Sequence, residues 1–395
     1  MRRFAVVVFL AFCSSVPRAQ PPAPVVPQES KDAVNAAQLK AAIDKLGTVD
    51  FAVRMGAART VRRAPSALAV PALLQAVAEH ADGYVRFRAL VLLSGFNDPR
   101  TRDVMFKALS DPNDRLRTVA YSYFEHHTDP TVLPTLLAAL GREETEFVRP
   151  ALTRAIAAYG ADPRARKEAA ALVMKGQDLF RAVVIEAIGD YRGAYALDPI
   201  TDVAKIDGPL QDDAVIALGK LRQQRALATL SALQRTAPRH VQPSIAAAIC
   251  LLGTNCSSHQ GYLTESLKFS IENAGFQELL RASAGGLAAL AVSGREDAAA
   301  ELFAQGAPTR DPARAAIALA LGTVALRNTA LLVKVLEHQA DLAAAAELLR
   351  EAFDMLEEDF DEERFFVSVR RAYWQAAQGS PARNVAAVLI KTLEF

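Results

Sequence analysis

The 395-residue sequence has few aromatic residues, few cysteines and almost no net charge. Aromatic side chains make up 7% of the residues although 51% are apolar, so the apolar content is mainly Ala, Leu and Val, which helices accommodate well. The 45 basic and 44 acidic residues leave a net charge of +1. This balance provides no long-range attraction to nucleic acid or anionic lipid, and we expect no nucleic-acid partner.

Motifs that carry common enzyme chemistry are also missing. There is no G-x-S-x-G nucleophile elbow, no Gly-rich phosphate loop, no H-E-x-x-H and no C-x-x-C. We therefore expect no catalytic residues, no metal and no cofactor. Only an active site assembled from residues distant in the sequence would escape this search.

Long apolar runs are lacking, and a short one lies at the N-terminus. Arg2 and Arg3 precede nine apolar residues, Phe4 to Phe12, which are too few to cross a bilayer as a helix. This arrangement is typical of a secretory signal, and we interpret residues 1–19 as a signal peptide. No later segment has about 18 consecutive uncharged apolar residues, so we expect no membrane span in the mature chain.

The residues around this signal leave its processing open. Lipidation at Cys13 is one alternative, and a twin-arginine signal is another. Residues 20–36 contain four prolines and are expected to form a disordered linker. Cys250 and Cys256 would remain after cleavage, an even number that suits an oxidising compartment. We expect the mature protein to be periplasmic or secreted in a bacterium.

From residue 37 the sequence repeats with a period close to 31 residues. Seven apolar residues hold equivalent places at spacings of 30 to 32, and most of them precede an arginine. They are Val53, Val85, Leu116, Val148, Phe180, Leu210 and Val241. A fixed period of this size predicts a solenoid in which each unit packs only on its neighbours.

Each period is expected to form a pair of helices. Asp98-Pro99 suits the start of a first helix and Asp111-Pro112 that of a second, because Asp accepts bonds from free N–H groups and Pro tolerates the first helical position. Several second helices are predicted to end at a glycine in the left-handed conformation. These glycines are Gly95, Gly160, Gly189, Gly219 and Gly253.

The pattern resembles the short bacterial HEAT-like repeats, the class that includes subunits of phycobilin lyases. The resemblance is carried by V-R-F-R-A at residues 85–89 with Gly95, and by Phe180-Arg181. It covers residues 50–253 and implies an all-α fold, an α-α superhelix of stacked helix pairs. Because HEAT arrays host many functions, the resemblance implies little about activity.

The register slips after Gly253. Residues 254–275 are longer and more polar than the earlier connections, so we divide the chain into regular repeats at 37–253 and divergent repeats with a C-terminal cap at 254–395. Later helical segments are predicted at 276–292, 297–305, 311–327, 331–338, 341–356 and 362–391. In total we expect roughly ten to twelve helical pairs.

Five arginines form the most regular polar pattern. Each follows an acidic residue by three or four positions at the same place in its unit. They are Arg54, Arg86, Arg117, Arg149 and Arg181. The row predicts either an inter-repeat ladder of charge-assisted hydrogen bonds or a basic stripe for an acidic partner.

Smaller clusters suggest local chemistry. Cys250 and Cys256 are predicted to form a disulfide, whereas with His259 they would supply three zinc ligands. Glu-His-His at residues 125–127 does not favour a metal site, because adjacent helical residues point about 100° apart. The acidic residues within 357–363 lack the glycine of a calcium loop and are interpreted as a solvated helix end.

We therefore expect an exported, non-catalytic scaffold that binds a protein or peptide on the concave face lined by the second helices. The alternative is an enzyme or chromophore-handling protein resembling the HEAT-type bilin lyases. A deep apolar pocket with converging titratable groups would favour the alternative, and a broad open groove would favour the scaffold.

Overall fold

The computed structural model describes residues 34–356 and 359–395. Within them the chain forms 22 α-helices in eleven consecutive pairs, two short 3-10 helices (η1, Lys45–Gly47; η2, Ala194–Ala196) and no β-strand. The first helices of the pairs are α1 (Ala36–Asp44), α3 (Ser66–Glu79), α5 (Arg100–Ala108), α7 (Leu133–Ala139), α9 (Pro163–Leu172), α11 (Leu197–Ala204), α13 (Ala226–Thr236), α15 (Cys256–Glu272), α17 (Glu296–Gly306), α19 (Thr329–Leu336) and α21 (Asp359–Gln375). The second helices are α2 (Phe51–Arg63), α4 (Gly83–Ser94), α6 (Asp114–His126), α8 (Arg149–Ala158), α10 (Asp178–Asp190), α12 (Gln211–Lys220), α14 (Gln242–Leu251), α16 (Gln277–Val292), α18 (Ala313–Arg327), α20 (Leu342–Met355) and α22 (Pro381–Thr392). The predicted signal peptide and Cys13 lie outside the described residues.

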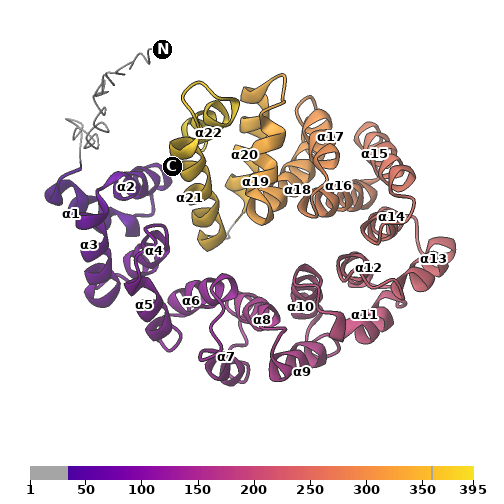
Figure 1. Ribbon diagram of the computed structural model, residues 1–395, viewed down its shortest axis with the longest axis horizontal. Coiled ribbons are helices and arrows are strands. Elements are labelled where there is room, and N and C mark those ends of the chain that lie inside the picture. The colour runs from indigo at the N-terminus through magenta and orange to yellow at the C-terminus, as the bar shows by residue number, and fades with distance from the viewer. Residues whose placement is uncertain (1–33, 357–358) are drawn as a thin grey trace, which may run out of the picture. The chain divides into compact units, whose positions relative to one another are not determined.

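Successive second helices pack on one another along the array. Figure 1 shows α6 to α18 of this set on the inner side of a curve, with their partner helices outside. The predicted all-α superhelix of helix pairs is confirmed, and eleven pairs fall within the predicted range.

Helix starts follow the predicted chemistry with one shift. Asp162 accepts a hydrogen bond from the Arg164 backbone N–H at the start of α9, and Asp98 accepts one from Arg100 at the start of α5. The second helix α6 begins later than Asp111-Pro112 suggested, because Asn113 caps it by accepting from the Arg115 N–H at 3.0 Å. Side-chain acceptors before the first turn therefore set these boundaries.

The prediction that five second helices end at a glycine in the left-handed conformation is wrong for four of the five glycines. Of the five, only Gly253 has a positive φ, at 82°. Gly189 and Gly219 lie inside their helices, and a Cβ on Gly219 would lie 2.5 Å from the Cα of Ala248. Their role is to let neighbouring second helices approach closely, and the chain turns a few residues later.

Most of the segment predicted to be a polar connection, residues 254–275, is instead the helix α15. Its buried side chains Leu263, Ser266, Leu267 and Ser270 recur at helical spacing. Two of the four are serines, and the Ser270 hydroxyl donates to the Ser266 carbonyl at 2.7 Å. A buried face that is half serine hides the apolar periodicity on which the prediction depended.

The C-terminal pair joins both ends of the array. Phe365 and Phe366 of α21 pack in the core of the C-terminal half, whereas Phe360 belongs to the core of the N-terminal half. The helix also contacts α4 and α6. This segment therefore covers the end of the array, as a cap does, and also ties residues about 300 positions apart.

The prediction of a solvated acidic helix end is wrong for two of the described acidic residues, whereas Asp359 and Glu362 are partly exposed. Asp361 and Glu363 are buried. Glu363 lies against Arg62 of α2 at 2.6 Å and against Arg370 at 3.2 Å. Arg62 and Arg327, which come from other helix pairs, neutralise Glu363 and Asp361. The sequence does not show that these residues lie close together. Residues 357 and 358 lie outside the described residues.

Candidate functional site

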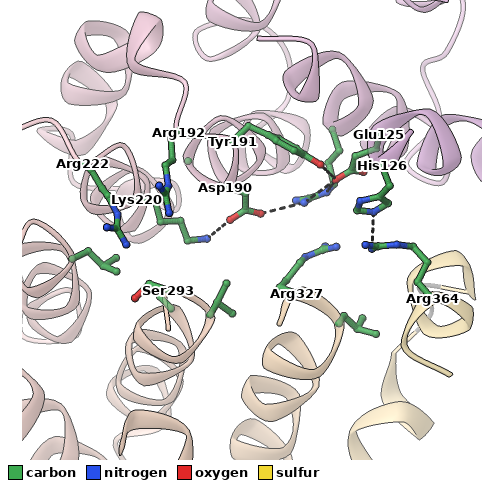
Figure 2. Close-up of a pocket in the computed structure, with 16 residues that line it drawn as sticks. Glu125, His126, Asp190, Tyr191, Arg192, Lys220, Arg222, Ser293, Arg327 and Arg364 are labelled. Carbon is green, nitrogen blue, oxygen red and sulfur yellow. Dashed lines mark hydrogen bonds and ion pairs between the residues drawn. The ribbon is translucent and has the colours of Figure 1, made fainter. Parts of the chain in front are cut away.

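The inner helices enclose two adjoining cavities, which we call the inner cleft. The first lies mainly at the C-terminal ends of these helices (Figure 2), and the second extends to the first turns of α12 and α14. The first cavity has a volume of about 280 Å³ and the second of about 340 Å³. Five residues line both of them: Asp190, Lys220, Ala289, Val292 and Arg327. Because charged and apolar side chains are mixed, the inner cleft is neither a deep apolar pocket nor a broad open groove.

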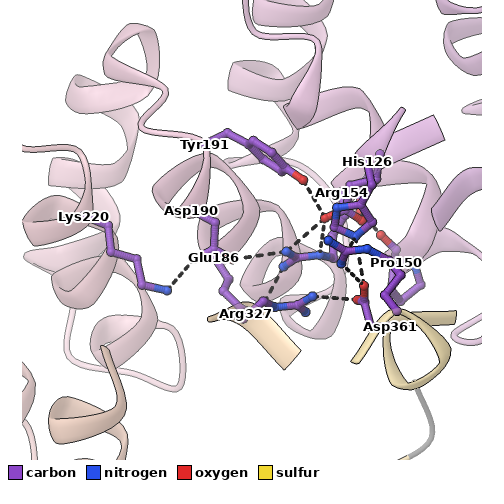
Figure 3. A network of polar contacts seen from close by, with 12 residues as sticks. His126, Pro150, Arg154, Glu186, Asp190, Tyr191, Lys220, Arg327 and Asp361 are labelled. Atoms are coloured by element: carbon purple, nitrogen blue, oxygen red, sulfur yellow. Dashed lines mark hydrogen bonds and ion pairs between the residues drawn. The ribbon is translucent and has the colours of Figure 1, made fainter. Parts of the chain in front are cut away.

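One wall of the first cavity is a chain of buried ion pairs (Figure 3). Arg154 of α8 donates to Glu125 and to Asp190, both at 3.1 Å, and Lys220 donates to Asp190 at 2.7 Å. The Tyr191 hydroxyl donates to Glu125 at 2.8 Å. Burial would lower the pKa of Arg154, but the surrounding carboxylates outweigh it and hold that pKa well above its ordinary value.

Asp361 of α21 forms a second polar cluster beside this wall (Figure 3). Its Oδ1 lies 2.9 Å from His126 Nε2 and accepts from Arg364 at 2.7 Å, while Oδ2 accepts from Arg327 at 2.7 Å. Burial would raise the pKa of Asp361, but the His126 hydrogen bond and the two guanidinium charges bring it well below its usual range. Both oxygens of this carboxylate therefore have hydrogen-bonding partners.

Arg192 and Arg222 differ from the other cations that line the first cavity. The other cations there form ion pairs with Glu125, Asp190 or Asp361. Among the described residues, no side-chain hydrogen bond or ion pair involves Arg192 or Arg222. Both are exposed, and Figure 2 shows both side chains pointing into the cavity. The first cavity therefore offers two guanidinium groups that donate no hydrogen bond to residues 34–356 or 359–395.

The second cavity has an acidic wall instead. Glu186, Asp212 and Asp213 line it. Burial, together with the charges of Glu186 and Asp212, raises the pKa of Asp213 to about 6. Burial also raises the pKa of Asp212, whose Oδ1 is buried without a hydrogen-bond partner in the described part of the chain. The lining of the first cavity is thus mainly basic, whereas the second cavity combines this acidic wall with Lys220, Arg281 and Arg327.

Comparison with known families identifies the repeat. Residues 70–157 match the family described as HEAT repeats. This part of the chain consists of HEAT repeats. No curated protein matches the chain significantly.

Solved structures resemble the chain at low identity. The complex of CpcE and CpcF of phycocyanin lyase from Nostoc sp. PCC7120 is 17% identical, with 66% of this chain and 97% of that chain covered at a TM-score of 0.41. Kap121p bound to Nup53p is 13% identical, with 93% of this chain and 49% of that chain covered at a TM-score of 0.41. At such values the likenesses carry no argument about function.

The five periodic arginines lie near the starts of the second helices. Three of them donate to a carbonyl at the end of the preceding first helix: Arg86 to Val77 (2.8 Å), Arg149 to Leu140 (2.5 Å) and Arg181 to Val173 (2.9 Å). Arg54 and Arg117 donate to carbonyls of the connecting loops, those of Thr48 (3.1 Å) and Asp111 (2.9 Å). None of the five lines either cavity.

Two of these arginines also reach the next HEAT unit. Arg86 donates to the Asp111 carboxylate at 2.5 Å, and Arg117 pairs with the buried Glu143 at 2.7 and 3.0 Å. Burial would raise the pKa of Glu143, but the hydrogen bond from Arg117 lowers it overall. Such contacts are of the kind that an inter-repeat ladder requires.

Cys250 and Cys256 are joined by a disulfide, with their Cα atoms 4.2 Å apart. The bridge links the end of α14 to the first residue of α15. Leu251, next to Cys250, lines the first cavity. Among the described residues, no group of three or more His, Cys, Asp or Glu side chains is arranged to hold a metal ion.

Arg192 and Arg222 were missed in the sequence because the periodic search followed the starts of the second helices. A signal was present at their ends: G-D-Y-R at 189–192 and G-K-L-R at 219–222 place arginine three residues after equivalent glycines. His126 was singled out, but its partners Asp361 and Arg364 come from the far end of the chain.

No single helix in the described part of the chain is long and apolar enough to cross a membrane. One bent pair, α18 and α19, passes by length and composition alone, with 118° between its helices.

Proposed function

We propose that this protein is an exported, non-catalytic scaffold that holds a protein or peptide partner in its inner cleft. The observation that carries the proposal is the arrangement of the first cavity, which seven inner helices and α21 surround. Two of its cations, Arg192 and Arg222, have no side-chain partner in the described part of the chain. A HEAT array that holds polar donors in fixed positions is suited to binding an extended segment. Export is supported by the N-terminal signal pattern and by the disulfide.

A second candidate function rests on Asp213. A carboxyl whose pKa is about 6 in a cleft is a candidate general acid or base, as an enzyme or chromophore-handling protein would require. Both cysteines that would remain in the mature chain are joined in the disulfide, so neither is available as a nucleophile. The scaffold is therefore the better-supported function.

A cleft-filling variant tests the scaffold. Val292 lines both cavities, so Val292→Trp should occupy the space where they join. Leu319→Trp, at an exposed position of α18 outside both linings, is the matched control. The wild-type chain and the control, tagged and expressed in the native periplasm, should retain the same cross-linked partner, and Val292→Trp should lose it. Retention of that partner by a folded Val292→Trp variant would show that the inner cleft is not the binding surface.

A further inference from the structure

Arg192 and Arg222 occupy backbone positions that disfavour arginine. Both have positive φ, 52° and 55°, just after the ends of α10 and α12. Asn97 has a positive φ of 52° at the corresponding place after α4, and Gly253 has one of 82° at the corresponding place after α14. Asparagine tolerates this conformation, whereas a long side chain there carries strain. Strain of this kind clusters at functional sites, so the two arginines call for a reason other than folding.

The direction of the two side chains supplies that reason. Both line the first cavity and point into it, towards the side where Ser293 lies (Figure 2). The Lys220 ammonium, from the same turn as Arg222, is neutralised by Asp190 at 2.7 Å. Two like charges in one cavity repel each other, and an anion between them would relieve that repulsion.

The chain itself shows which anions this inner face accepts. Its own acidic segment, at the start of α21, places Asp361 on His126, Arg327 and Arg364. His126 of α6 and Arg327 of α18 belong to the inner helices and line the same first cavity as Arg192 and Arg222, whereas Arg364 belongs to α21 itself. The inner face is therefore already a receptor for carboxylates of a peptide segment, and part of its basic surface is unoccupied.

We propose that Arg192 and Arg222 form a carboxylate-binding site that takes an acidic peptide segment of the partner. The inference rests on the proposed function and names the chemistry of its ligand. The planar guanidinium fork matches a carboxylate with two parallel hydrogen bonds. The acidic wall of the second cavity, with Glu186 and Asp213, repels further negative charge, so the site selects a short acidic stretch.

The test replaces both arginines with the residue that their backbone favours. Arg192→Asn/Arg222→Asn removes the charges and relieves the strain, so the variant should melt no lower than the wild type. The matched control is Arg225→Asn/Arg235→Asn, which removes two exposed charges outside both cavities. The probe is a fluorescein-labelled tetraglutamate peptide, titrated by fluorescence anisotropy, with inorganic phosphate as competitor.

The expected result is peptide binding that weakens at least about tenfold in the Arg192→Asn/Arg222→Asn variant and is unchanged in the control. Equal binding by both variants would overturn the site. A lowered melting temperature would also overturn it, since the arginines would then be structural. Phosphate that competes as well as free tetraglutamate would show a site for small oxyanions and overturn the peptide assignment.

The outcomes for the site and for the scaffold are separable. Peptide titration uses the purified chain alone, so it does not depend on a native partner. Suppose that tetraglutamate binding is lost with the two arginines while Val292→Trp still retains its partner. This outcome would overturn only the placement of that partner in the inner cleft. Loss of the partner in Val292→Trp with no tetraglutamate binding would overturn the carboxylate site alone.

Discussion

Replacing Glu363 with alanine should destabilise the protein far more than breaking an exposed ion pair. The side chain is 1% exposed and accepts from Arg62 at 2.8 Å (Nε) while lying 2.6 Å from its Nη2. Arg370 donates to it at 3.2 Å. Removal of this carboxylate leaves the Arg62 guanidinium, itself 7% exposed, buried without an acidic partner.

The expected loss in the free energy of unfolding is about 3–5 kcal/mol, because an uncompensated buried charge remains. Arg370 adds less, since its side chain is 23% exposed and regains water. Glu347→Ala is the matched control. Its partner Arg350 lies at 2.8 Å, but both side chains are about half exposed, so its loss should stay under about 1 kcal/mol.

Urea unfolding followed by circular dichroism measures both variants. Because long arrays can unfold in parts, hydrogen exchange in α21 should be measured alongside, and it should accelerate selectively in Glu363→Ala. A leucine pair at positions 62 and 363 should recover much of the loss, since apolar residues can replace a buried ion pair. A loss in Glu363→Ala no larger than in Glu347→Ala would refute the reasoning.

Three further changes probe other contacts. Arg117→Ala should cost roughly 1–3 kcal/mol by thermal denaturation, because it leaves the buried Glu143 without its main donor; an unchanged melting temperature with lost partner binding would favour the basic stripe. Asp213, with its pKa raised to about 6, binds protons more readily folded than unfolded, so stability should fall as pH rises from about 4 to about 6; Asp213→Asn should remove that fall and gain up to about 3 kcal/mol at neutral pH, and an unaltered pH profile of urea unfolding contradicts this. Reduction of the Cys250–Cys256 bridge should cost about 2 kcal/mol at most, and two free thiols in denatured, unreduced protein from an oxidising compartment would exclude the bridge.

The fold could be predicted because its pattern is local and repeated. Apolar residues such as Val85 and Leu116 recur at one period and are buried at equivalent places in successive second helices. Capping residues such as Asp162 act within a few residues of their own helix. Both kinds of information lie within one or two units, so a single sequence suffices to read them.

The errors came where packing overrode local preference. Gly219 suggested a helix end, yet it lies inside α12. A glycine is needed there because the backbone of Ala248 in the neighbouring helix leaves no room for a Cβ. The helix α15 was missed because serines occupy part of its buried face. A serine hydroxyl can be buried there when it donates a hydrogen bond to a carbonyl of its own helix. Neither effect is visible without knowing the neighbouring helix.

The inner cleft could be predicted only in part. The arginines after Gly189 and Gly219 were visible as a spaced pair, but their direction depends on the left-handed backbone after each helix. The pairing of Asp361 with His126 joins residues 235 positions apart. The two residues meet because the array curves: small rotations between successive units add up and bring its two ends together.

We expect the contact of α21 with the N-terminal half of the array to affect ligand binding in the first cavity. The first cavity takes Glu125 and Arg154 from the N-terminal half of the array, and Arg327 and Arg364 from the C-terminal half and α21. If the contacts of Glu363 are lost and α21 detaches, the two halves no longer hold these walls together. Arg192 and Arg222, which are already exposed, would keep their backbone conformation but would lose the opposite wall of the cavity. Water would then screen their charges more strongly, and a carboxylate would be bound less tightly. Tetraglutamate binding should therefore weaken in Glu363→Ala although that residue touches no ligand, and unchanged binding would show that the cavity does not depend on closure.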